Sequence, residues 1–186
     1  MKLSDGEKLI ILMLNDLHRS NNVKSDFDPD FLDEAIRDNH LWSITWKYPG
    51  IEFNSQNDNT PPLVKEVLDY LEMWSFIEAS YKRLSPEEIE RLKQLAPVFG
   101  NKPVFEGFDG NNESEYLATA TFIINKLERF TEFSGRYLNS HSPSIDGYKR
   151  MLVVYKQEME NNNYSLLKAD SLAKVLNERT HPSCRK

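Results

Sequence analysis

The sequence predicts an all-α protein of about seven helices. Apolar residues recur at steps of three and four over long stretches, capping residues precede several of these stretches, and no pair of strand-like segments is present. The 186 residues suit a single domain. Aromatic residues make up 11% of the chain and provide bulk for a core. We expect the helices to pack around a central buried helix at about residues 113–133.

The first helix is expected from Ser4 to His18. Ser4 is a natural N-cap, and Glu7 follows three residues later, which is the spacing of a capping box. Apolar residues almost surround this segment, so we expect the helix to be well buried.

The second helix is expected to start at Pro29, with Asp28 as its N-cap. The three aspartates within 26–30 also resemble the start of a calcium loop. That loop needs glycine at its sixth position and glutamate at its twelfth. Phe31 and Arg37 occupy these positions, so the capping interpretation is favoured.

Residues 41–48 fit two kinds of structure. Trp42, Ile44 and Trp46 alternate as in a half-buried strand, yet Trp42 and Trp46 are also one helical turn apart. An isolated strand would have nothing to pair with, so we favour a helix that continues through Trp46. The polar stretch 52–62 that follows is expected to be a loop.

Five more helices are expected after this loop. A long one opens at Pro62, a short one runs from the N-cap Ser85 to Ala96, and the others cover 116–133, 148–155 and 168–178.

A connector at 97–102 follows the short helix, because Pro97, Gly100 and Pro103 interrupt the helical pattern there. The predicted organisation is one domain, 1–180, with two packed lobes at 1–96 and 103–180. Residues 181–186 are expected to form a disordered tail.

Four stretches together carry a family resemblance: SDGEKLIILMLNDLH, EVLDYLEMWSFIEASY, FEGFDGNNESEYL with the following TFIINKLERFTEF, and YKRMLVVY. Through them the chain resembles the YfbU family of bacterial proteins over about residues 3–155. The resemblance implies an all-helical fold, a cytoplasmic bacterial protein and a homo-oligomer, with a dimer favoured. It implies no activity, because the family is functionally uncharacterised.

No recognised catalytic or metal-binding motif is present. The four histidines form no H-E-x-x-H pair, a single cysteine excludes a C-x-x-C pair, and phosphate-binding glycine loops are absent. We therefore predict no metal, no cofactor and no catalytic residue, and we lean against an enzyme. With neither a signal peptide nor a membrane-length apolar run in the sequence, the expected location is the cytoplasm.

Two polar groups remain for consideration. Asp109, Asn111 and Glu113 could form a cation loop, but the neighbouring glycines favour a tight turn and a helix cap. A cationic group is formed by Arg129, Arg136 and His141. It could bind an anion or an acidic partner, although ion pairs within the protein are the favoured explanation.

Three functions follow from these observations. The leading hypothesis is a non-enzymatic helical interaction or regulatory module that self-associates. A second is a DNA-binding regulator with a winged-helix-like N-terminal half. The net charge of −6 and the acids expected on the surface of the long helix, Glu66, Asp69, Glu72 and Glu78, disfavour nucleic acid. A third is a small-anion-binding protein or enzyme with a site near Arg129 and His141.

Overall fold

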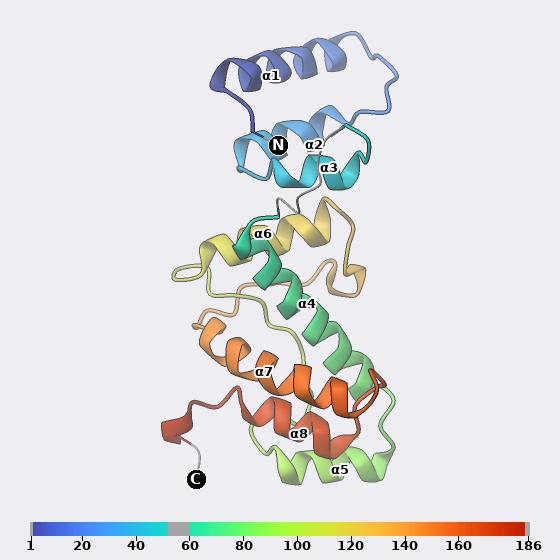
Figure 1. The fold of residues 1–186 in the computed structure, drawn as a ribbon, viewed down its shortest axis with the longest axis vertical. Coiled ribbons are helices and arrows are strands. Elements are labelled where there is room, and N and C mark those ends of the chain that lie inside the picture. Colours follow the sequence, from blue (N-terminus) through green and yellow to red (C-terminus); the bar gives the residue numbers. More distant parts are fainter. Residues whose placement is uncertain (1, 52–59, 185–186) are drawn as a thin grey trace. The chain divides into compact units, whose positions relative to one another are not determined.

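The protein is all-α, as predicted. A computed structural model describes residues 2–51 and 60–184 (Figure 1). In these residues it has eight α-helices, two short 3-10 helices and no strand. An isolated parallel bridge joins Phe108 to Asn139. The chain divides into two compact units, Met1–Pro62 and Leu63–Lys186.

The first unit contains three helices: α1 (Asp5–Ser20), α2 (Pro29–Arg37) and α3 (Trp42–Lys47). The predicted capping box of Ser4 and Glu7 is present, and the carboxylate of Asp28 accepts hydrogen bonds from two N–H groups of the first turn of α2. Residues 42–47 are helical, as favoured. The expected continuous helix is interrupted at Asn39, which has a left-handed φ of 61°.

The prediction that the first helix is well buried is wrong. Only Asn15 of α1 is buried, and large apolar side chains of this helix are exposed. The reason is that α1 contacts α2 through its polar side, which is described below.

The second unit contains the remaining elements. Its helices are α4 (Pro62–Tyr81), α5 (Pro86–Leu95), α6 (Ser114–Asn125), α7 (Ile145–Asn161) and α8 (Ala169–Asn177), with 3-10 turns at Thr131–Phe133 and Pro182–Cys184. Within this unit α8 packs on both α5 and α7, as Figure 1 shows.

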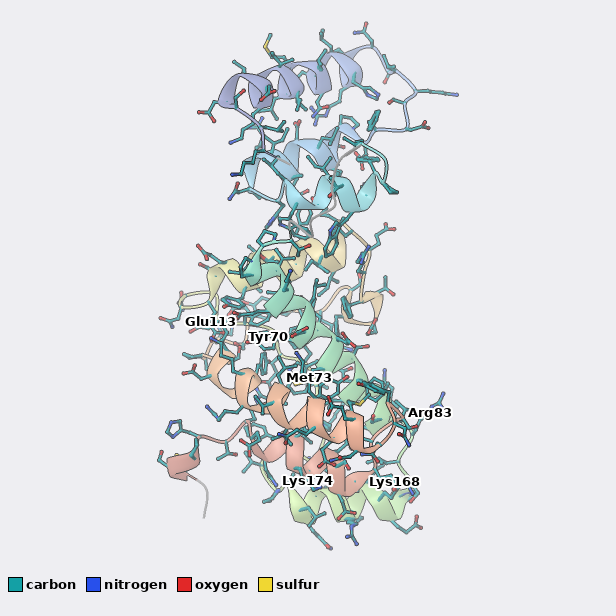
Figure 2. All side chains as sticks on the ribbon, viewed as in Figure 1. Tyr70, Met73, Arg83, Glu113, Lys168 and Lys174 are labelled. Atoms are coloured by element: carbon teal, nitrogen blue, oxygen red, sulfur yellow. The ribbon has the colours of Figure 1, made fainter. Side chains whose placement is uncertain are left out.

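Five aromatic side chains form the centre of this unit. Neighbouring rings have centroids 5.5 to 6.2 Å apart, and at most 3% of each side chain is exposed. They are Tyr70, Trp74, Phe105, Phe108 and Tyr148. Tyr70 and Met73 lie on the side of α4 that faces α7 (Figure 2). Fully burying a side chain of this kind contributes about 1.5–3 kcal/mol, so the five together stabilise the unit substantially.

Two predicted boundaries differ from the structure. The helix expected to reach residue 133 ends at Asn125, because Glu128 and Phe130 adopt left-handed φ values of 52° and 54°. The predicted connector 97–102 does not separate two compact units, because α5 on one side of it packs on α8 on the other. In the predicted disordered tail, residues 181–184 are exposed and include a 3-10 turn, while 185–186 lie outside the described residues. Residues 52–59 of the predicted loop also lie outside the described residues.

Candidate functional site

Arg136, one of the three predicted site residues, forms an ion pair with Glu78 of α4. The guanidinium donates to both carboxylate oxygens of Glu78, at 2.7 and 2.8 Å, and to the backbone oxygen of Glu132 at 2.9 Å. The N–H of Phe105 donates to the same carboxylate at 2.9 Å. Glu78 is therefore buried and paired, whereas the sequence predicted it to be exposed. A two-pronged pair of this kind fixes both side chains.

The environment keeps both members of this pair charged. Burial alone would raise the pKa of the Glu78 carboxyl, but the hydrogen bonds from Arg136 and from the N–H of Phe105 lower it. The hydrogen bond to Glu78 in turn raises the pKa of Arg136. The guanidinium also lies 4.9 Å from the ring centroid of Phe133, at a distance suited to a cation–π contact.

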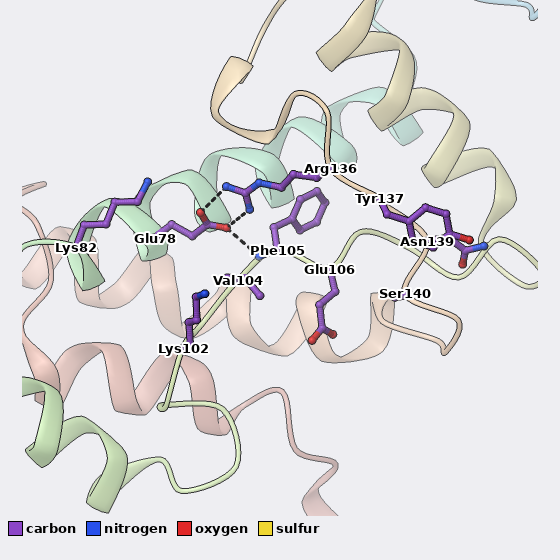
Figure 3. Close-up of a pocket in the computed structure, with 10 residues that line it drawn as sticks. All are labelled: Glu78, Lys82, Lys102, Val104, Phe105, Glu106, Arg136, Tyr137, Asn139 and Ser140. Carbon is purple, nitrogen blue, oxygen red and sulfur yellow. Dashed lines mark hydrogen bonds and ion pairs between the residues drawn. The ribbon is translucent and has the colours of Figure 1, made fainter.

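A pocket of about 660 Å³ opens beside this pair, and we call it the basic pocket (Figure 3). Its charged lining consists of Lys82, Lys102 and Arg136 against Glu78 and Glu106. The carboxylate of Glu106 is paired with Arg179. Among the residues that the structure describes, neither lysine has an ion-pair partner. Since Arg136 is held by Glu78, the two lysines are the groups of this pocket that can bind an anion.

Arg129 and His141 do not line the basic pocket. Arg129 has an exposed side chain, and its N–H donates to the carbonyl oxygen of Ile123 at 3.1 Å. His141 lies beside the pocket residue Tyr137, with its Nε2 3.2 Å from the phenolic oxygen. Of the predicted trio, only Arg136 lines the basic pocket.

Glu113 stands at the N-cap of α6, as the predicted cap requires, but its side chain makes no cap hydrogen bond to that helix. Its buried carboxylate accepts four hydrogen bonds, at 2.7 to 2.9 Å. The donors are the N–H groups of Asp109, Ser144 and Ile145 and the hydroxyl of Ser144. This residue therefore ties the start of α6 to the start of α7 (Figure 2).

The most unusual surface of the first unit is the outer side of α1. Five large apolar side chains are each 57–59% exposed. We call them the apolar face: Leu9, Ile10, Met13, Leu14 and Leu17. Their spacing places them on one side of a helix with 3.6 residues per turn. Contiguous exposed apolar surface is rare on monomeric proteins and marks interaction sites.

The opposite side of α1 explains this orientation. Asn15 donates to Asp33 of α2 at 2.6 Å, and Arg19 donates to Asp33 and Asp30 at 2.7 and 2.8 Å. The hydrogen bond to Asp33 raises the pKa of Arg19, and the hydrogen bond to Asp30 raises it further. Polar groups thus fasten α1 to α2, and the apolar face is left on the outside.

Comparison with known proteins assigns the chain to a family. The model of the YfbU domain matches residues 46–178. The chain belongs to the YfbU family. A relative in this family, UPF0304 protein MJECS11 of Methanocaldococcus jannaschii, is 31% identical over 119 residues. The alignment covers 60% of this chain and 64% of the relative, so it spans less than two thirds of the relative's length.

The matched YfbU region contains the whole basic pocket and Glu113, but it does not contain α1 or α2. The sequence resemblance had included residues 4–18, which lie outside the match. The family assignment brings no activity with it.

Two further findings bear on the site. Within residues 2–51 and 60–184, no group of three or more His, Cys, Asp or Glu side chains is placed to hold a metal ion. No helix in the same ranges has the length and apolarity to cross a membrane.

Sequence reasoning missed the apolar face and the pair of Glu78 with Arg136. For the apolar face, the sequence signal was the polar character of Asn15 and Arg19, which lie on the side of α1 opposite that face. No signal in the sequence pointed to the second, because its two residues are far apart in the chain.

Proposed function

We propose that this YfbU-family protein is a non-enzymatic interaction module that self-associates through the apolar face of α1. The observation that carries the proposal is the exposure of all five large side chains of this face. Removing such side chains from water contributes about 1.5–3 kcal/mol each when burial is complete, and a second copy of α1 offers a matching surface.

The charges of α1 favour an antiparallel pair. The first turn carries Asp5 and Glu7, and the last turn carries His18 together with Arg19, which is already paired with Asp30 and Asp33 of α2. Antiparallel pairing places the acidic end of each helix beside the basic end of its partner and also aligns the two helix dipoles favourably. Parallel pairing would place like charges together. In the antiparallel arrangement Met13, midway between Leu9 and Leu17, lies opposite Met13 of the second copy.

The test is the molar mass in solution, measured by size-exclusion chromatography with light scattering. We expect a mass near twice 21.7 kDa for the wild-type chain and a monomer for Met13→Glu, which places two carboxylates at the centre of the pair. Val153→Glu is the matched control, because Val153 is a similarly exposed apolar residue on α7. This control should keep the wild-type mass.

Two results would overturn the proposal. One is a wild-type chain that stays monomeric at high concentration. This result would count against the proposal even if a hydrophobic dye failed to bind α1, because the apolar face would then be covered by something other than a second copy. The other is an oligomer that Met13→Glu leaves intact.

A further inference from the structure

A second pocket, of about 430 Å³, lies between α4 and α7 in the second unit. We call it the acidic aromatic pocket. It has the opposite character to the basic pocket, and the proposed self-association does not use it. The residues that matter here are Glu72 and Phe76 of α4, Tyr155 and Glu160 of α7, and Tyr164, which follows α7.

Aromatic side chains form part of its wall. The rings of Phe76 and Tyr155 meet edge to face, with centroids 6.1 Å apart. Tyr164 is 71% exposed and has a left-handed φ of 57°, and its N–H donates to the carbonyl oxygen of Met159 at 2.8 Å. This hydrogen bond fixes the backbone of an exposed tyrosine at the rim of the pocket. Aromatic faces carry partial negative charge and attract cations.

The charges around the pocket have the same sign. Three carboxylates line it against one cation, Lys156, which pairs with Asp69 at 2.8 Å. Within the described residues, Glu72 and Glu160 have no ion-pair partner. The pKa of the Tyr155 phenol is raised by burial, and the negative charges of Glu72 and Asp69 raise it further. The pocket therefore combines a negative potential with an apolar wall.

We propose that the acidic aromatic pocket binds an organic cation with two ammonium groups joined by a short alkyl chain. Glu72 and Glu160 bind the ammonium groups, and the chain lies against Phe76, Tyr155 and Tyr164. A dication fits because two carboxylates remain after Lys156 has neutralised Asp69. The volume lies within the usual range for small-molecule sites.

Isothermal titration of the full chain with cadaverine at low ionic strength tests this proposal. We expect saturable binding that weakens as salt is added. Glu72→Gln and Glu160→Gln should each weaken it about fivefold, as expected for the loss of one charge pair near the surface. Tyr164→Asn should weaken it about threefold, since asparagine tolerates the left-handed backbone but has no ring.

Matched controls make the result specific. Glu115→Gln removes an exposed carboxylate of α6 outside the pocket and should leave the affinity unchanged. Pentylamine, with the same chain length and one ammonium group, should bind more weakly, and glutarate, the corresponding diacid, should not bind.

Three outcomes would overturn the proposal. The first is the absence of cadaverine binding, and the second is binding that neither Glu72→Gln nor Glu160→Gln weakens. The third is pentylamine binding as tightly as cadaverine, which would describe a site for a single ammonium group, such as a lysine side chain of a partner. The variants change exposed or rim residues, so circular dichroism should show an unchanged fold.

Discussion

Glu78 is the residue whose chemistry most directly links pH to the stability of the second unit. Only 6% of its side chain is exposed, against 29% for Arg136, and both oxygens of the carboxylate accept hydrogen bonds from the guanidinium. Its pKa is lowered in the folded protein, so the unfolded chain binds a proton more readily. The stability that Glu78 contributes is therefore present above its ordinary pKa of 4.5 and is lost as the pH falls through the lowered value.

We predict that Glu78→Gln lowers the free energy of unfolding by about 2 kcal/mol at neutral pH, because Arg136 is left unpaired and half-buried. The difference between wild type and variant should shrink as the pH falls from 4.5 through the lowered pKa of the folded state, because below that value the wild-type carboxyl is protonated in both states. Urea denaturation followed by circular dichroism over this pH range measures it.

Glu90→Gln is the control for this prediction. It breaks the exposed pair of Glu90 with Lys93 and should change the free energy of unfolding by less than about 0.5 kcal/mol. Equal effects of the two variants would contradict a special role for Glu78.

At the scale of elements, the second unit depends on a close crossing of two segments that are not helical. The N–H of Phe108 donates to the carbonyl oxygen of Leu138 at 3.0 Å, and the N–H of Ser140 donates to the carbonyl oxygen of Phe108 at 3.1 Å. Gly107 has a φ of 85°, and a Cβ atom there would lie 1.7 Å from the carbonyl oxygen of Leu138. Only glycine allows the two backbones to approach this closely.

We predict that Gly107→Ala lowers the free energy of unfolding by about 3 kcal/mol or more, because the added methyl group forces the segments apart. Gly135→Ala is a close control. Gly135 also has a positive φ, 74°, but no atom lies within 4 Å of the added Cβ. Gly135→Ala should lower the free energy of unfolding by only about 1–2 kcal/mol, which is the cost of the left-handed backbone for alanine. Thermal unfolding of both variants tests the prediction, and similar losses would contradict the importance of the crossing.

The sequence predicted helix starts well, because these depend on residues that are close together in the chain. The caps at Ser4, Asp28 and Ser85 are all present, because a capping side chain needs only the next three residues. The end of α6 was missed, because the left-handed residues Glu128 and Phe130 carry no glycine-like signal. Periodicity identified the apolar side of α1 but could not show that its polar side would find acids on α2.

The candidate site was less predictable for a related reason. Arg136 was selected only as a member of a cationic group with Arg129 and His141, and the structure pairs it with Glu78. The partner comes from a helix 58 positions away in the chain, a pairing that only the tertiary fold creates. The two lysines of the basic pocket and the aromatic residues of the acidic pocket were likewise brought together by packing.

At the scale of the whole molecule, the division of the chain at Pro62 leads to a prediction about fragments. Residues 60–186 contain the aromatic core and all five helices of the second unit. We expect this fragment to unfold cooperatively on heating, with the circular dichroism of a helical protein. A fragment of residues 103–186, cut at the connector that the sequence indicated, should not unfold cooperatively, because it lacks α4 and the α5 surface on which α8 packs. Cooperative unfolding of the shorter fragment would contradict this division.

The four hydrogen bonds of Glu113 have a consequence for any search for ligands in this family. Converging N–H groups at the start of a helix are a common binding site for phosphate and other anions. At the start of α7 the N–H groups of Ser144 and Ile145 are already occupied by a carboxylate of the same chain. Because that carboxylate is covalently attached, its effective concentration at the site is far above that of a free anion. Glu113 thus acts as a permanent internal ligand, and a dissolved anion would have to displace it to bind there.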